Sequence, residues 1–154
     1  MIKENIGLRG YFYIRHCRGN ELLEEIKVHN TVTNVGKDEV AGLINGTRTG
    51  AFAYLSLGTS ETAASATDTE LKAAIAAGSL ARASATCTQV TTDVANDTAQ
   101  LVHTFTATAG YGVKEAGIFD TATSGGRMLA RGTFAVKAMT NGDTLTVTYK
   151  IDVD

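Results

Sequence analysis

The sequence contains no proline and no tryptophan, and only two of its 154 residues are cysteine. At ordinary usage of about 5%, roughly eight prolines would be expected, so we expect glycine, asparagine and aspartate to form the turns. Two cysteines are too few for a disulfide framework, and Cys17 and Cys87 lack the paired spacing of a zinc site. We therefore expect two free thiols in a reducing cytoplasm.

Neither sign of charge dominates the sequence. Fourteen basic and sixteen acidic residues give a net charge of -2, and no stripe of lysine or arginine is present to neutralise phosphates, so we expect no nucleic-acid partner. The start of the chain lacks the basic and apolar segments of a signal peptide, and no apolar run reaches eighteen residues, so we expect neither export nor a membrane anchor. The hydrophobic content of 44% is that of one globular domain.

Alternation of threonine with apolar residues predicts a mainly β fold. In residues 144–153 every odd position is apolar and every even position is polar, as in a strand with one buried face. Residues 127–139 form a similar strand, and the Thr-Asn-Gly-Asp sequence at 140–143 supplies a hairpin turn, so we expect these two strands to pair. A strand over 112–119, joined to them by the Ser-Gly-Gly turn at 124–126, completes a predicted three-stranded meander.

The remaining strand signals and turns extend over the rest of the chain. They predict a hairpin around residues 18–20 and seven or eight short strands in all, which favours an antiparallel β-sandwich or barrel-like domain. We expect this β domain over residues 30–154, preceded by an amino-terminal arm and hairpin over 1–29. The further predicted strands are 11–17, 23–28, 51–57, 80–92 and 101–108.

The sequence also predicts a first short helix that begins with a capping box. Residues 67–70 read Thr-Asp-Thr-Glu, in which the threonine hydroxyl and the glutamate carboxylate accept hydrogen bonds from free backbone amides. Leu71 and Ile75 follow one turn apart and make a narrow apolar stripe. Gly78 is expected to end this helix.

A second helix is predicted over residues 37–45. Its spacing presents Val40, Leu43 and Ile44 to the core, and an Asn-Gly pair follows it. Residues 58–66 are small and polar, and we expect them to form an exposed loop.

No local motif for enzymatic chemistry is present. His16, His29 and His103 stand outside any metal-binding or triad pattern. His16 is adjacent to Cys17, and neighbouring strand residues point to opposite faces, which disfavours a thiolate–imidazole pair. The Gly-Tyr-Gly sequence at 110–112 lacks the third glycine of a nucleotide-binding loop. We expect no catalytic, cofactor-binding or metal-binding residues.

Glu115 is the one polar residue whose burial would be expensive, and it lies next to Lys114 in an otherwise largely apolar strand. A catalytic carboxylate would need a second acid or a base nearby, which the spacing does not offer, so we interpret Glu115 as half of a structural ion pair beneath the sheet surface. The turn at 124–126 sets Glu115 near Arg131, which is therefore the first predicted partner, and Arg82 is the second.

Five short motifs follow one another along residues 30–154. In this order they resemble small virion-surface proteins of tailed bacteriophages, which include head-decoration (cement) proteins and the attachment domains of tail fibres. The resemblance implies a rigid β scaffold that binds the major capsid protein or another virion protein, as a homo-oligomer and most simply a trimer. The motifs are Asn30-Thr31-Val32-Thr33-Asn34-Val35-Gly36, Tyr54-Leu55-Ser56-Leu57-Gly58-Thr59-Ser60, Ala66-Thr67-Asp68-Thr69-Glu70-Leu71, Lys114-Glu115-Ala116-Gly117-Ile118-Phe119-Asp120 and Met128-Leu129-Ala130-Arg131.

Three functions remain open on this basis. A capsid decoration protein is preferred, because the chain stops directly after its last strand instead of continuing into a shaft. The alternatives are a tail-fibre, collar or baseplate component, and an unrelated carbohydrate-binding or enzymatic β domain. We expect contact with the virion through the arm 1–9 and the loop 58–66, both mobile until a partner orders them. The expected contact residues are Met1, Ile2, Lys3, Glu4, Asn5, Gly58, Thr59, Ser60, Glu61 and Thr62.

Overall fold

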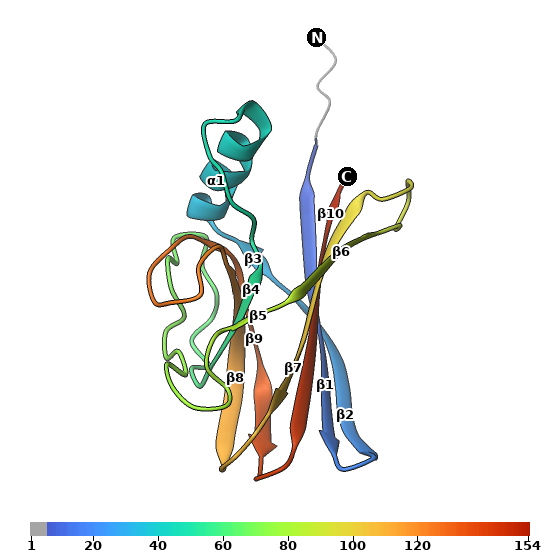
Figure 1. Ribbon diagram of the computed structural model, residues 1–154, viewed down its shortest axis with the longest axis vertical. Helices are drawn as coiled ribbons and strands as arrows, with labels where there is room; N and C mark the ends of the chain where they lie inside the picture. The colour runs from blue at the N-terminus through green and yellow to red at the C-terminus, as the bar shows by residue number, and fades with distance from the viewer. Residues whose placement is uncertain (1–5) are drawn as a thin grey trace.

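A computed structural model describes residues 6–154, which form two five-stranded antiparallel sheets packed face to face as a sandwich (Figure 1). The predicted fold class is thereby confirmed as a β-sandwich. Sheet A has the strand order β2(Glu21–His29), β1(Leu8–Arg18), β10(Thr144–Val153), β7(Thr98–Thr106) and β6(Thr86–Val90). Sheet B has the order β3(Thr31–Val32), β9(Met128–Met139), β8(Tyr111–Phe119), β4(Tyr54–Gly58) and β5(Ala83–Ser84).

The core lies between the two sheets and uses the apolar face that the alternation predicts. The hairpin of β1 and β2 belongs to sheet A, because β1 pairs with β10 from Leu8 to Cys17. From sheet B, the opposing side chains come from β4, β8 and β9. Fully buried core residues include Phe12, Ile14, Leu145, Val147 and Tyr149 in sheet A and Leu55, Leu57, Val113, Ile118 and Ala130 in sheet B.

The predicted meander is only half right. β8 and β9 pair as expected, with Glu115 opposite Thr133. β9 and β10 do not pair, because the turn at 140–143 carries the chain from sheet B to sheet A. The carboxylate of Asp143 accepts a hydrogen bond from the Thr140 amide at 2.9 Å and holds this turn. Alternation requires one buried face of each strand, and two strands in opposite sheets meet that requirement as well as two neighbours do.

The predicted strand over 80–92 is in fact two strands in different sheets. β5 pairs with β4 in sheet B, whereas β6 pairs with β7 in sheet A. The chain crosses between the sheets at Ala85, whose amide donates to the carbonyl oxygen of Ala53 at 2.8 Å. No glycine or other turn residue marks this crossing in the sequence.

The helix predicted over residues 67–78 is absent. This segment lies without helical structure over the outer face of sheet B, where the Ile75 amide donates to the carbonyl oxygen of Leu57 and the Thr59 amide to that of Ala73, each at 2.9 Å. Glu70 faces Arg82 instead of capping a helix. The backbone groups that a helix would pair internally are satisfied by the sheet, so tertiary contacts override the local helix signal.

The other predicted helix is α1(Asn34–Asn45), which begins three residues earlier than expected. Thr33 caps it, because its hydroxyl accepts a hydrogen bond from the Gly36 amide at 2.8 Å. The expected core face is wrong: Leu43 and Ile44 are 36% and 82% exposed, and only Val40 packs against the core. Gly36 lies against the backbone of Leu129, and this close approach selects the inward face of the helix.

Candidate functional site: a buried charge cluster and an apolar end

Glu115 and Arg131, the first predicted ion pair, are in direct contact and have no exposed side-chain surface. Arg131 Nε donates to Glu115 Oε2 at 2.8 Å, and Arg131 Nη1 donates to Asp68 Oδ2 at 3.0 Å. The second carboxylate oxygen of Asp68 lies 2.7 Å from Lys72 Nζ. Two negative and two positive side chains therefore balance one another within this charge cluster, as buried ions require.

The charge cluster fastens the segment 59–73 to the outer face of sheet B. Glu115 accepts hydrogen bonds from the backbone amides of Lys72 at 3.1 Å and Ala73 at 2.8 Å. Arg131 donates to the carbonyl oxygens of Thr62 at 2.8 Å and Ala63 at 3.2 Å. The expectation that the loop 58–66 is mobile until a partner orders it disagrees with this geometry, since a buried guanidinium and a buried carboxylate hold its backbone. The sequence predicted only the ion pair of Glu115 and Arg131, and none of these backbone contacts with the loop.

Asp68 is the member of the charge cluster that lies inside the predicted capping box at 67–70, and no partner was predicted for it. Burial alone would raise its pKa, but hydrogen bonds from Lys72, Ser65 and Arg131 bring the pKa below its ordinary value. The carboxylate is therefore ionised at neutral pH and completes the charge balance. The charge cluster therefore has the chemistry of a structural ion-pair network.

Arg82, the second predicted partner of Glu115, does not contact it. Its guanidinium lies 3.5 Å from the ring centre of Phe119 and donates to Glu70 Oε2 at 3.1 Å. It also donates to three carbonyl oxygens of the loop between β8 and β9, those of Thr121, Thr123 and Gly125. The planar guanidinium of Arg82 thus holds that loop in place by donating to several of its carbonyl oxygens.

His16 forms a second buried polar contact that sequence reasoning missed. On β1, His16 continues the alternation of the inward-facing residues Phe12 and Ile14. This alternation is the sequence signal from which its burial could have been predicted. Its Nε2 lies 2.9 Å from Asp143 Oδ2, and Arg18 donates to both oxygens of the same carboxylate. The Arg18 guanidinium, the Thr140 amide and His16 hold the pKa of Asp143 well below its usual range.

The other two histidines lie beside aromatic rings. His29 is 4.7 Å from Tyr11 between ring centres, and His103 is 4.5 Å from Phe105. Both cysteines are free thiols, as expected. Within residues 6–154, no three His, Cys, Asp or Glu side chains are grouped so that they could hold a metal ion.

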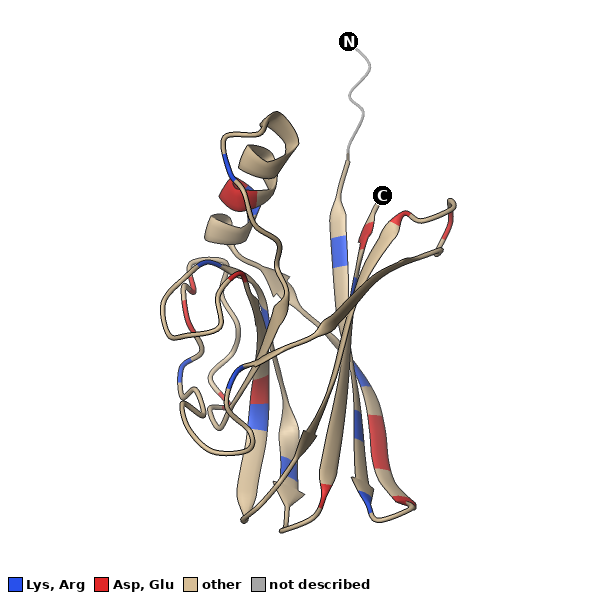
Figure 2. Ribbon diagram, viewed as in Figure 1, with Lys and Arg blue, Asp and Glu red and all other residues tan. Residues whose placement is uncertain are grey.

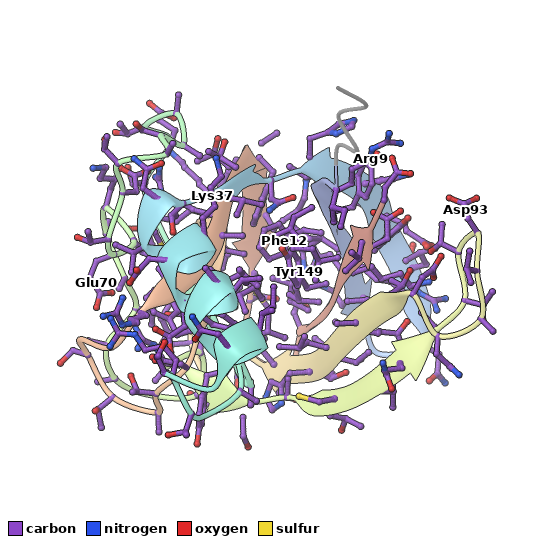
Figure 3. The ribbon with its side chains drawn as sticks, turned by 90° about the horizontal axis from the view of Figure 1, so that it is seen from above. Arg9, Phe12, Lys37, Glu70, Asp93 and Tyr149 are labelled. Atoms are coloured by element: carbon purple, nitrogen blue, oxygen red, sulfur yellow. The ribbon has the colours of Figure 1, made fainter. Side chains whose placement is uncertain are left out.

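An apolar groove of about 710 Å³ opens at one end of the sandwich, at the top in Figure 1. It lies between α1 on one side and the inner face of β6, β7 and β10 on the other, and Figure 3 shows this end from above. Strands of sheet A extend past sheet B here, so their inward residues lack a covering sheet. The groove is lined mainly by Leu8, Val40, Leu43, Phe52, Leu101 and Ile151.

Exposed apolar side chains are frequent at this end. In the described part of the chain, eight large hydrophobic residues are exposed, and five of them belong to segments that reach this end. Two of the five, Leu43 and Val153, line the groove itself. Exposed apolar surface of this kind commonly marks an interaction site. We refer to the groove and these five residues as the apolar end. The five residues are Ile6, Leu43, Ile44, Val94 and Val153.

The two predicted contact segments occupy different places in the structure. Residues 6–9 lead into β1 at the apolar end, whereas Met1 to Asn5 lie outside the described residues. The loop 58–66 lies over the outer face of sheet B, where Gly58 is buried against Glu115 and Thr59, Glu61 and Thr62 are exposed. The apolar end was not predicted, because the sequence does not show which sheet is longer.

With twelve residues, α1 is too short to cross a bilayer, and the structure of residues 6–154 contains no longer apolar helix. Comparison of the chain with protein-family models, with curated proteins and with solved structures finds no match.

Proposed function

We propose that the protein is a structural component of a bacteriophage virion that decorates the outer surface of the head and stabilises it by adhesion. The observation that carries this proposal is the apolar end, which is an open docking surface on a scaffold whose loops are fastened by buried charges. The resemblance of the ordered motifs to virion-surface proteins supplies the partner class, the major capsid protein. The proposal includes no catalytic step.

The apolar end by itself would bind weakly. Burying a fully exposed large apolar side chain contributes about 1.5–3 kcal/mol. The five residues are on average about two-thirds exposed, so burying what remains exposed would contribute about 5–9 kcal/mol together. Association costs about 4–15 kcal/mol in lost freedom of motion. Several copies in one assembly would combine such contacts, since each additional contact becomes an intramolecular event. This arithmetic supports a homo-oligomer, of which a trimer is the form expected from the resemblance.

The proposal is tested by substitution of exposed residues at the two ends of the sandwich. Ile44→Ser with Val153→Ser alters the apolar end, and Leu22→Ser with Leu23→Ser at the β1–β2 turn is the matched control. Cosedimentation with heads that lack the protein should show binding weakened about tenfold or more for the first pair. Equal binding by both pairs would remove the apolar end as the docking surface.

The location on the particle separates head decoration from a role in the tail fibre, collar or baseplate. Gold-labelled protein on intact virions should appear in many copies over the head, and particles without it should lose heat resistance. Label confined to the tail would favour the attachment role, and unchanged heat resistance would exclude the cement role.

A further inference from the structure

β6 forms one edge of sheet A, and among the strands of residues 6–154 it pairs with β7 alone. An edge strand presents a row of backbone N–H and C=O groups that are free to pair with another chain. Soluble proteins usually block such edges with charged side chains, with very short strands or with a covering element.

Three of the four sheet edges in the described residues are protected. β3 and β5, the edges of sheet B, have two residues each. β2, the other edge of sheet A, carries Glu24, Glu25 and Lys27 in its middle. Charged side chains at an edge disfavour pairing with a second strand, and two copies of β2 would place like charges close together.

β6 has none of these features. The stretch 83–92, Ala-Ser-Ala-Thr-Cys-Thr-Gln-Val-Thr-Thr, contains no charged residue, no glycine and no proline. Thr86, Cys87, Thr88 and Gln89 are all exposed, although threonine and valine are typical of paired strands. Figure 2 shows β6 without charge. The charged residues nearest to it in the sequence are Arg82, which precedes β5, and Asp93, which lies in the turn after β6. An uncharged strand of high β propensity at an open edge is a typical site of strand pairing between chains.

We propose that β6 pairs antiparallel with β6 of a second copy of this chain, which joins the two A sheets across a two-fold axis. With Thr88 on the axis, Thr86 lies opposite Val90 of the second copy and Cys87 opposite its Gln89. All of these pairs are uncharged, and a strand that pairs with itself forms the self-complementary interface of a two-fold dimer. The assembly is then a two-fold dimer, in place of the trimer expected from the resemblance.

The pairing has a consequence for the apolar end. Cys87 and Gln89 lie opposite Leu101 and Ala99 of β7, on the sheet face that lines the groove. A two-fold axis perpendicular to the sheet keeps this face on the same side in both copies. The dimer therefore presents two grooves in one direction, while the interface itself does not depend on what the grooves bind.

The dimer is tested by sedimentation equilibrium with Thr88→Lys, which places two like charges against each other at the axis. Thr106→Lys, on the same face of the inner strand β7, is the matched control. The unaltered chain and the control should sediment at about twice 16.1 kDa, and Thr88→Lys should raise the dissociation constant about tenfold or more. A monomer at all concentrations, a trimer, or a dimer unaffected by Thr88→Lys would overturn the proposal.

The register is tested by cross-linking in a Cys17→Ser background. Gln89→Cys introduces a thiol opposite Cys87 of the second copy, and diamide as the oxidant should convert each thiol pair into a disulfide that appears as a covalent dimer on a non-reducing gel. Cys87 alone faces Gln89 and should not cross-link. Cross-linking by Cys87 alone, without any increase on Gln89→Cys, would contradict this register. Head binding by the Thr88→Lys monomer is a separate measurement, so the docking proposal and the dimer can fail independently.

Discussion

Replacement of Glu115 by alanine should reveal how much of the stability depends on the charge cluster. Glu115 and Arg131 have no exposed surface, and their charged atoms are 2.8 Å apart. Removing one partner of such a pair costs about 3–5 kcal/mol, because the other charge stays buried. The amides of Lys72 and Ala73 also lose their acceptor, whereas Asp68 still faces the guanidinium, so we expect Glu115→Ala to lose about 3–5 kcal/mol in all.

The assay is urea unfolding followed by far-ultraviolet circular dichroism, since the chain has no tryptophan. Lys114→Ala is the control, because Lys114 is the adjacent residue and forms an exposed ion pair with Glu61 at 3.0 Å. An exposed pair contributes about 0–1 kcal/mol, so the control should unfold almost as the unaltered protein does. Trypsin should cleave after Lys72 faster in Glu115→Ala, because the segment 59–73 loses its attachment.

The double variant Glu115→Ala with Arg131→Ala measures the interaction directly. Residues that share a buried ion pair should show a coupling free energy of about 1–3 kcal/mol, so the double variant loses less than the two single losses added together. Losses near those of Lys114→Ala, or additive losses with a coupling below about 0.5 kcal/mol, would refute the reasoning. They would mean that Glu115 contributes no more than a solvated strand residue.

Two further predictions concern acid stability and helix packing. Hydrogen bonds from Arg18 to Asp143 and from the Val94 amide to Asp97 hold the pKa of each carboxyl well below the ordinary 3.8. As the pH falls, the unfolded chain therefore binds protons first, so this stabilisation is complete above about pH 5 and is lost progressively at lower pH. Urea midpoints that do not decrease from pH 7 through pH 4 to pH 3 would contradict this. In the same urea unfolding assay, Gly36→Ala should lower the free energy of unfolding by about 1–3 kcal/mol. The reason is that a Cβ at this position would lie 2.5 Å from the Leu129 carbonyl oxygen. Ala41→Ser, on the exposed face of the same helix, is the control and should leave the free energy of unfolding nearly unchanged.

Local sequence patterns determined the strands and one of the central contacts. Period-two alternation predicted β10 with its full range and β1, β7, β8 and β9 to within a few residues. The pair of Glu115 and Arg131 could also be predicted, because the strands that carry them follow one another and are joined by a loop that contains the Ser-Gly-Gly turn. Burial of one face and pairing across a short turn are local properties, so they can be inferred without the rest of the chain.

Only the tertiary structure decided which sheet each strand joins. The turn at 140–143 and the crossing at Ala85 both change sheets, and neither differs in residue type from a hairpin turn or a strand interior. The capping box at 67–70 forms no helix because the amides of Lys72 and Ala73 bind the Glu115 carboxylate, which is more than forty residues away along the chain. The apolar end arises because sheet A is longer than sheet B at the α1 end. Each of these features depends on partners distant in the sequence, and local propensity is too weak to oppose them.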